Sequence, residues 1–278
     1  MKDNSGSIIS NLIWRFAERC GAQGVSFIVS VVLARILAPE VYGTIALVTV
    51  FTAILQVFID SGLGNALIQK KGADDLDYSS VFWGNMILCS CLYIVLFAAA
   101  PLIADFYNDL SLIPVVRVMG LTLIISGLRN IQQAYVSKHM LFKKFFFATL
   151  GGTIVSAFVG IGMAICGFGV WALVAQYLVN RLIETCVLWI TVRWHPKLTF
   201  SIKRMKTLVS YGWKILASGL LDSIYNNLRQ LIIGRAYTST DLAFYNKGMQ
   251  IPNLVVTNVN TSIDSVLLPA MSNTQDDR

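Results

Sequence analysis

The chain has 278 residues, of which 55% are hydrophobic and only 13% charged, and its formal net charge is +7. Soluble domains carry about 25% charged residues, so this composition excludes an ordinary soluble protein. Several apolar stretches reach the roughly 20 residues that a helix needs to cross a bilayer. Backbone groups inside a bilayer must bond within their own segment, and the chain lacks the roughly ten-residue alternation of a membrane barrel. The sequence therefore predicts an all-α integral membrane protein.

The apolar stretches predict about eight transmembrane helices. In chain order these spans lie near 8–34, 41–67, 79–103, 112–136, 145–166, 170–192, 207–234 and 243–268. The connections between them alternate in charge. One set is basic and contains Lys70, Lys71, Lys138, Lys143, Lys144, Arg193, Lys197, Lys203, Arg204 and Lys206. The other set, at 39–40, 105–109, 167–169 and 239–241, is nearly free of lysine and arginine.

This alternation predicts the topology of the chain. Basic connections face the cytoplasm under the positive-inside rule, so both chain ends are expected there and no nucleic-acid partner is expected. The segment 196–206 alternates apolar and basic residues, which is typical of a piece lying on the cytoplasmic leaflet. This segment separates the first six predicted spans from the last two. We therefore expect an N-terminal six-helix lobe over 1–192, a cytoplasmic amphipathic linker over 193–206, and the first two helices of a truncated second lobe over 207–278.

A weak internal repeat supports this division. A shift of 200 residues places Arg35 on Arg235 and Asp60 on Asn260, and it aligns the connection at 35–43 with that at 235–243. Many transporters are built from such repeats, with the substrate site at the interface between them.

Polar residues form stripes inside the first, second, seventh and eighth spans. A charge at the bilayer centre costs roughly 2.5–3.5 kcal/mol on insertion scales, so it normally faces a bundle interior or a wet cavity. Residues three or four apart share one helix face. The stripes comprise Asn11, Arg15, Glu18, Arg19, Gln23, Ser26 and Ser30; Thr49, Thr52, Gln56 and Asp60; Lys214, Ser218, Asp222, Asn226 and Arg229; and Asn246, Gln250, Asn253, Thr257, Asn260 and Asp264.

Stripes on four helices in equivalent places predict one shared, hydrated cavity. The alternative is that the polar residues merely pair with one another and hold the bundle together, as Glu18 could with Arg15 or Arg19. Cations in a cavity would suit phosphate, which arginine can bind bidentately. The expected substrate-binding residues are Arg15, Arg19, Gln56, Lys214, Asn226, Arg229 and Asn253. The candidates for coupling to a cation or proton are the carboxylates of Glu18, Asp60, Asp222 and Asp264.

Two other spans show different patterns. The fifth carries Gly152, Ser156, Gly160 and Ala164 at four-residue spacing, which is typical of a seam where helix backbones approach closely. The third is almost wholly apolar after Asn85 and is expected to face lipid.

No motif in this sequence indicates a catalytic site. The five cysteines form no C-x-x-C pair and there are only two histidines, so no metal site is expected. The D-x-D segment at 75–77 is typical of sugar-nucleotide transferases, but its short loop favours a solvated turn. No P-loop, G-x-S-x-G or H-E-x-x-H motif occurs. We expect no cofactor and no enzymatic activity.

Four segments taken together resemble the polysaccharide transporter family. They are LARILAPEVYG at 33–43, DSGLGNALIQK at 60–70, GFGVWAL at 167–173 and LPAMS at 268–272. The likeness is to Wzx-type oligosaccharide flippases, including colanic acid exporters, within the superfamily that also holds MATE drug exporters and lipid II flippases. It implies two six-helix lobes around a central cavity, often with two further helices. The chain stops after its eighth span, so we expect a fragment or a truncated carrier.

The resemblance also implies a function. Its expected substrate is undecaprenyl-pyrophosphate-linked oligosaccharide, moved across the bacterial inner membrane by alternating access during synthesis of O-antigen, capsule or exopolysaccharide. The expected partners are this lipid-linked oligosaccharide, membrane lipids and other polysaccharide assembly proteins. Two alternatives remain open, a MATE-like drug or small-solute exporter and a non-transporting subunit of a polysaccharide assembly complex. A membrane polymerase should need a sizeable external loop, and none is predicted.

Overall fold

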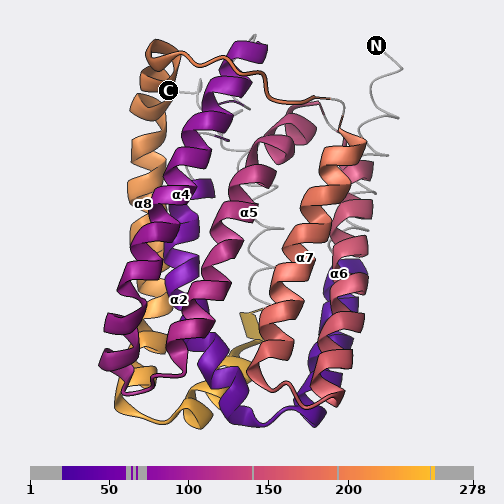
Figure 1. Ribbon diagram of the computed structural model, residues 1–278, viewed down its shortest axis with the longest axis vertical. Coiled ribbons are helices and arrows are strands. Elements are labelled where there is room, and N and C mark those ends of the chain that lie inside the picture. Colours follow the sequence, from indigo (N-terminus) through magenta and orange to yellow (C-terminus); the bar gives the residue numbers. More distant parts are fainter. Residues whose placement is uncertain are drawn as a thin grey trace, which may run out of the picture.

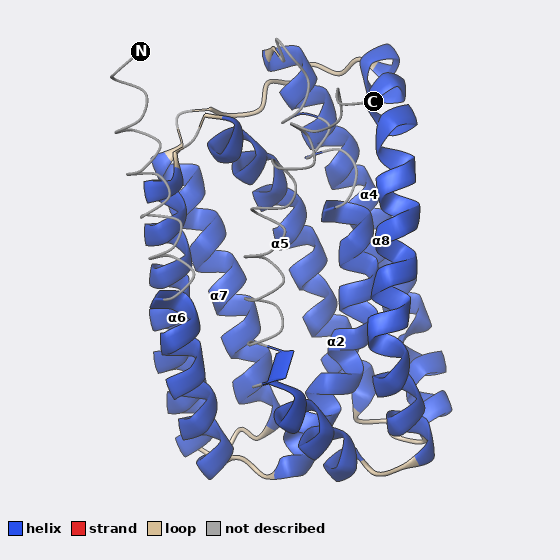
Figure 2. Cartoon of the chain, turned by 180° about the vertical axis from the view of Figure 1, so that it is seen from behind, coloured by secondary structure: helices blue, strands red, loops and turns tan. Residues whose placement is uncertain are grey.

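Helices account for nearly all of the chain that the structure describes. The computed structural model describes residues 21–60, 64, 67, 74–139, 141–192, 194–250 and 252–253. A helix over Gly21–Ile36 comes first, and one over 239–250 comes last. Between them lie α2 (Pro39–Asp60), α4 (Asp75–Tyr107), α5 (Leu112–Lys138), α6 (Phe142–Ile165), α7 (Val170–Thr191) and α8 (Ile202–Ala236). No strand occurs within these described ranges (Figure 2), which confirms the all-α prediction.

Five of these helices are long and apolar enough to cross a membrane. They are α2, α4, α5, α7 and the Lys143–Ile165 part of α6. The 22 residues of α2 extend about 33 Å at 1.5 Å per residue, which matches a hydrocarbon core of roughly 30 Å. α8 is longer, with 35 residues, but its polar stripe makes it less apolar. The chain is therefore a multi-pass helical membrane protein.

The helices lie side by side along a common direction (Figure 1). α5 lies between α4 and the α6–α7 pair, and α2 packs against both α5 and α8. The connections before α2 and after α4, α6 and α8 all lie at the end drawn at the bottom of Figure 1, here called the distal end. The α5–α6 and α7–α8 connections lie at the opposite end, here called the basic end because it carries Lys138, Lys143, Lys144, Lys197, Lys203 and Arg204.

Small residues let α6 and α7 approach closely, as the sequence predicted. A Cβ atom at Gly152 would lie 3.0 Å from the Asn180 carbonyl oxygen, and one at Gly160 would lie 3.0 Å from the Gln176 side chain. Ser156, in the same row, accepts a hydrogen bond from the Asn180 side chain at 3.5 Å. The seam therefore packs two backbones together and also contains a polar contact.

The outer side of α4 is apolar, which suits contact with lipid. Ile87, Ile94 and Leu102 are all exposed there. The other side of the helix packs into the hydrophobic core through Leu96 and Ala100, which are buried. The prediction that this span faces lipid therefore holds for one of its two sides.

A buried ion pair joins α5 to α7 in the interior of the bundle. The Arg129 guanidinium donates to the Glu184 carboxylate, and the two side chains are only 11% and 8% exposed. Arg181 reaches the same carboxylate oxygen at 3.4 Å. The sequence did not predict this pair. Because an unpaired buried charge costs far more than a paired one, Arg129 and Glu184 depend on each other.

Replacing Arg129 alone by methionine should therefore lower the free energy of unfolding by up to about 3–5 kcal/mol, since it leaves the buried Glu184 charge with only its longer contact to Arg181. Thermal unfolding in detergent would measure the loss. The double variant R129M/E184M removes both charges and should recover most of the stability. A double variant as unstable as R129M would contradict this account.

An acidic cluster caps the first turn of α4. The Asp74 carboxylate accepts from the Asp77 backbone N–H at 3.0 Å, and the Asp77 carboxylate accepts from the Asp74 N–H at 3.3 Å. This reciprocal pair is a capping box, which satisfies N–H groups that a helix start leaves without partners. Asp77 is 1% exposed. The interpretation of the D-x-D segment at 75–77 as a solvated turn is therefore wrong, because these residues begin a helix.

The segment 194–205 docks on this end of α4. The backbone N–H groups of Lys197 and Ser201 donate to the hydroxyls of Ser79 and Ser80, at 3.0 and 2.9 Å. Leu198 points outward and is 89% exposed, as expected of an apolar side chain lying at a membrane surface. α8 begins within the predicted linker, so the linker is shorter than the sequence suggested and is fixed to the bundle.

Arg204 binds the cap of α4 directly. Its guanidinium lies 2.6 Å from Asp74 Oδ1 and 3.1 Å from Asp77 Oδ1. The hydrogen bond from Arg204 is the main cause that lowers the pKa of Asp74 from 3.8 to about 2. A carboxyl group whose pKa is lowered by folding stabilises the fold above its unfolded pKa, and this contribution is lost as the pH falls through the folded value. The contact is therefore fully present at neutral pH.

Replacing Asp74 and Asp77 together by asparagine should release this docked segment, because Arg204 loses both carboxylates. Trypsin should then cleave after Lys197 several times faster than in the unmodified protein, as followed by gel electrophoresis at neutral pH. Asp105→Asn, a charge change at the distal end of the same helix, is the matched control and should leave the cleavage rate unchanged. Equal rates in the control and the double variant would show that the ion pairs do not hold the segment.

The connections at 37–38 and 237–238 have the same local structure. In each, the N–H of the first residue, Leu37 or Tyr237, bonds at 2.9 Å to the carbonyl four residues earlier, of Leu33 or Ile233. In each, the next helix begins two residues later. This agreement at an offset of 200 residues supports the predicted internal repeat.

Candidate functional site

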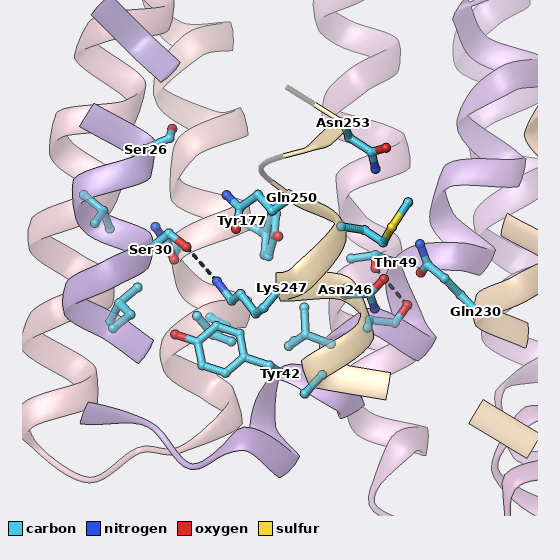
Figure 3. Close-up of a pocket in the computed structure, with 18 of the residues that line it drawn as sticks. Ser26, Ser30, Tyr42, Thr49, Tyr177, Gln230, Asn246, Lys247, Gln250 and Asn253 are labelled. Atoms are coloured by element: carbon cyan, nitrogen blue, oxygen red, sulfur yellow. Dashed lines mark hydrogen bonds between the residues drawn. The ribbon is translucent and has the colours of Figure 1, made fainter. Parts of the chain in front are cut away.

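A polar cavity of about 1080 Å³ lies between helix Gly21–Ile36, α2, α6, α7, α8 and the helix over 239–250. It is here called the first cavity, and Figure 3 shows ten of its lining residues labelled. Pockets for small ligands usually measure about 300–1,000 Å³, so this one can hold a sizeable polar group. Its polar lining residues are Gln23, Ser26, Ser30, Tyr42, Thr49, Thr153, Ser156, Gln176, Tyr177, Asn180, Arg181, Tyr225, Asn226, Asn227, Arg229, Gln230, Tyr245, Asn246, Lys247, Gln250 and Asn253.

The charges on the walls of the first cavity are positive. Arg181 of α7, Arg229 of α8 and Lys247 line it, and among the lining residues that belong to the described ranges none is acidic. The Arg229 guanidinium hydrogen-bonds to the side chain of Tyr245. Arg181 is partly balanced by Glu184, which is buried behind the wall. Such a surface favours an anionic ligand.

Lys247 lies in the part of the first cavity nearest the distal end. Its Nζ donates to Ser30 Oγ at 2.6 Å and lies 4.4 Å from the centroid of the Tyr42 ring. Figure 3 shows the ammonium group between these two side chains, with the hydrogen bond to Ser30 as a dashed line. The geometry combines a charge-assisted hydrogen bond with a cation–π contact. Lys247 thereby connects the helix over 239–250 to helix Gly21–Ile36 and to α2.

A second cavity, of about 910 Å³, lies along the seam between α2 and α8, toward the start of α8. Its polar lining residues are Gln56, Asp60, Lys214, Ser218, Asp222, Ser223, Asn226 and Asn227. Asn226 and Asn227 line both cavities, so the two spaces adjoin. The second cavity differs from the first in carrying charges of both signs. Within the described ranges, no group of three His, Cys, Asp or Glu side chains is placed to hold a metal ion.

Asp60 is held in the wall of the second cavity by neutral amides. Gln56 Nε2 donates to its Oδ1 at 3.1 Å, and Asn130 Nδ2 donates to the same oxygen at 3.2 Å. Asn130 also donates to the Ile59 carbonyl at 2.8 Å, which fixes the amide itself. The carboxylate is thus oriented by hydrogen bonds.

The described members of the four predicted stripes, with the exception of the buried Thr52, lie on the walls of these cavities. Asn226, Arg229 and Asn253 line the first, and Gln56, Asp60, Lys214, Asp222 and again Asn226 line the second. Arg15, Glu18, Arg19 and Asp264 fall outside the described residues. The structure divides the predicted shared cavity into two adjoining spaces, because the stripe on α8 from residue 214 to residue 229 runs about 22 Å along the helix and borders both of them.

A fifth stripe, on α7, was missing from the prediction. Gln176, Tyr177, Asn180 and Arg181 line the first cavity, and their spacing of three or four residues places them on one helix face. The spacing could have revealed this stripe. Lys247 was also missed, because it lies beside the row of amide side chains formed by Asn246, Gln250 and Asn253 and not within it. Two of the three cations of the first cavity were therefore not predicted.

Apolar helices around a polar, positively charged cavity define a multi-pass membrane protein with a polar interior. The chain belongs to the family described as polysaccharide biosynthesis protein, whose model matches residues 32–278. This confirms the resemblance found in the sequence. No solved structure matches the chain significantly.

Three relatives illustrate the family. The succinoglycan biosynthesis transport protein ExoT of Rhizobium meliloti (strain 1021) is 25% identical over 99% of this chain and 56% of its own length. The teichuronic acid biosynthesis protein TuaB of Bacillus subtilis (strain 168) is 30% identical over 78% of this chain and 46% of its own length. The lipopolysaccharide biosynthesis protein WzxC of Escherichia coli (strain K12) is 24% identical over 97% and 55%. The chain thus spans about half the length of these relatives.

Charged thiol reagents should distinguish the two cavities. With the native cysteines replaced by serine, a cysteine at Gln230 in the first cavity should react faster with an anionic methanethiosulfonate than with a cationic one, by on the order of tenfold. A cysteine at Ser218 in the second cavity should show a weaker preference, since acidic residues lie beside it. A cysteine at Ile87, on the lipid-facing side of α4, is the control and should react with neither. Equal reactivity at 230 and 87 would mean that no water-accessible cavity exists.

Proposed function

We propose that the chain acts as a carrier that moves undecaprenyl-pyrophosphate-linked oligosaccharide across the bacterial inner membrane by alternating access. The positive first cavity is the observation that carries this proposal. Three cations line it, the described part of its wall contains no carboxylate, and Glu184 behind the wall balances only part of the charge of Arg181. A pyrophosphate needs such a surface, and arginine can bind phosphate oxygens in pairs. The names of the relatives, which include a transport protein and several polysaccharide biosynthesis proteins, agree with this substrate class.

The remaining walls of the first cavity suit a sugar chain. Asn226, Gln230 and Gln250 present amides that can both donate and accept hydrogen bonds to hydroxyl groups. Tyr42 and Tyr177 add aromatic surface with a polar end. We expect the pyrophosphate and the first sugars to enter this space while the polyprenyl tail stays in lipid. The chain would then bind and orient its substrate without chemical conversion, as a carrier and not as an enzyme.

The second cavity would serve the coupling of transport to an ion. Asp60 and Asp222 face this space together with Lys214. Binding of a cation or proton there would shift the balance between conformations only if it binds one of them more tightly. Glu18 and Asp264 remain further candidates for the same role, and Arg15 and Arg19 for binding the pyrophosphate.

The proposed organisation follows the sequence division. Residues 1–192 would form the first lobe, 193–206 the linker and 207–278 the start of a second lobe. The basic end would face the cytoplasm under the positive-inside rule, with both chain ends on that side. Substrate would therefore enter from the cytoplasmic leaflet, and other polysaccharide assembly proteins would supply and use it.

A MATE-like exporter of cationic drugs fits the charges less well. A cation entering the first cavity would meet Arg181, Arg229 and Lys247 without a compensating carboxylate on the described wall. Like charges in one desolvated space repel each other, so such a substrate would be disfavoured. A non-transporting subunit would have no need for a cavity open to water.

Alanine at Arg181 or Arg229 should lower polysaccharide export about tenfold, since a hydrogen bond to a charged group contributes roughly 1.5–3 kcal/mol. Arg15→Ala and Arg19→Ala should have similar effects. Export would be measured as surface polysaccharide in cells that depend on the complete reading frame containing residues 1–278. Arg235→Ala, on the same helix as Arg229 but outside both cavities, is the matched control.

Undiminished export in the Arg15, Arg19 and Arg229 variants together would remove the basis for the proposal. A deletion strain that keeps its surface polysaccharide but accumulates a cationic dye would point to a drug exporter instead. Protein levels in the membrane must be compared first, so that loss of export is not loss of folding.

A further inference from the structure

Lys247 differs from the other cations of the first cavity in the partners that it binds. Arg181 binds Glu184 one turn along its own helix, and Arg229 binds the side chain of Tyr245, beyond the next connection. Lys247 instead binds Ser30, 217 positions earlier in the chain. Its ammonium group is both part of the cavity wall and a link between the two parts of the internal repeat.

The Lys247–Ser30 hydrogen bond lies next to the contacts that join the two parts of the repeat at the distal end. A Cβ atom at Gly43 would lie 1.9 Å from the Ser239 carbonyl oxygen, so the start of α2 and the start of the helix over 239–250 are in direct backbone contact. The Thr240 hydroxyl donates to Glu40 Oε1 at 3.0 Å in the same place. Both of these contacts lie at the rim, outside the lining of the first cavity. Of these contacts at the distal end, the one made by Lys247 is therefore the one that a ligand in the first cavity can reach.

We propose that Lys247 couples substrate binding to opening of the distal end, by exchanging its bond to Ser30 for one to the pyrophosphate. This inference rests on the proposed function, because it takes the pyrophosphate as the ligand of the first cavity. Ser30 and Tyr42 are neutral partners, whereas a phosphate oxygen carries charge and forms a stronger bond with an ammonium group. The bound ligand therefore withdraws Lys247 from the first part of the repeat.

Loss of this link weakens the closed arrangement. The hydrogen bond to Ser30 and the cation–π contact with Tyr42 exist only while the two parts are together at this end. A ligand that replaces them binds the open arrangement more tightly than the closed one, which is the condition for shifting the equilibrium between the two. The Gly43–Ser239 contact then separates, and the cavity gains a path toward the distal side.

Cysteine cross-linking between positions 40 and 240 would test this coupling. In a protein whose native cysteines are replaced by serine, Glu40→Cys and Thr240→Cys should form a disulfide rapidly under mild oxidation when no ligand is present. Undecaprenyl pyrophosphate in micelles should slow the reaction about tenfold, because this factor corresponds to the free energy of one hydrogen bond to a charged group. Undecaprenol, which has the same tail without phosphate, should not slow it.

Two further variants separate the coupling role from a purely structural one. Lys247→Met should slow the disulfide reaction without ligand and make it insensitive to undecaprenyl pyrophosphate. Ser30→Ala keeps the cavity charge and should also slow the reaction without ligand, while binding of undecaprenyl pyrophosphate is retained or strengthened. Lys206→Met, near the start of α8 and outside both cavities, is the matched charge-loss control and should behave like the parent.

The possible outcomes discriminate between the two proposals. If undecaprenyl pyrophosphate binds, measured by its protection against thermal unfolding, but the disulfide rate in the parent does not change, the coupling role of Lys247 is wrong and the proposed function stands. If it does not bind to any version of the protein, the proposed function fails first. A ligand response that persists in Lys247→Met would also overturn the inference.

Discussion

The absence of water inside a bilayer is the constraint on which this structure depends. A polar side chain there must find a partner or a wet space, since leaving it in hydrocarbon is costly. The protein meets the constraint in two ways. Arg129 and Glu184 neutralise each other in the buried interior of the bundle, whereas Arg181, Arg229 and Lys247 face a cavity. The difference between these two solutions separates residues that hold the bundle together from residues that can meet a ligand.

The arrangement of α8 follows from contacts at both of its ends. At the basic end, Arg204 binds the cap of α4. At the distal end, a Cβ atom on Gly234 would lie 2.2 Å from the Leu47 side chain of α2, so the two helices meet closely there as well. Between these points lie the residues that line both cavities. α8 is therefore held to the preceding part of the chain at both of its ends.

Much of the fold and part of the site could be predicted from the sequence, because a membrane helix shows its environment through a simple periodicity. The stripe containing Asn226 and Arg229 and the seam containing Gly152 and Gly160 are both repeats of three or four residues, and the structure places the stripe on cavity walls and the seam between α6 and α7. The ion pair of Arg129 with Glu184 could not be predicted in the same way, since its partners are 55 positions apart. Docking of the segment 194–205 depends on similar long-range contacts.

The contact between Glu40 and Thr240 bears on the predicted internal repeat. These positions are 200 residues apart, which is also the offset of the internal repeat, so each residue touches its own counterpart. In a symmetric dimer, only residues on the two-fold axis meet their counterparts in the other subunit. A contact between equivalent positions is what the predicted internal repeat would give on an axis of approximate two-fold symmetry.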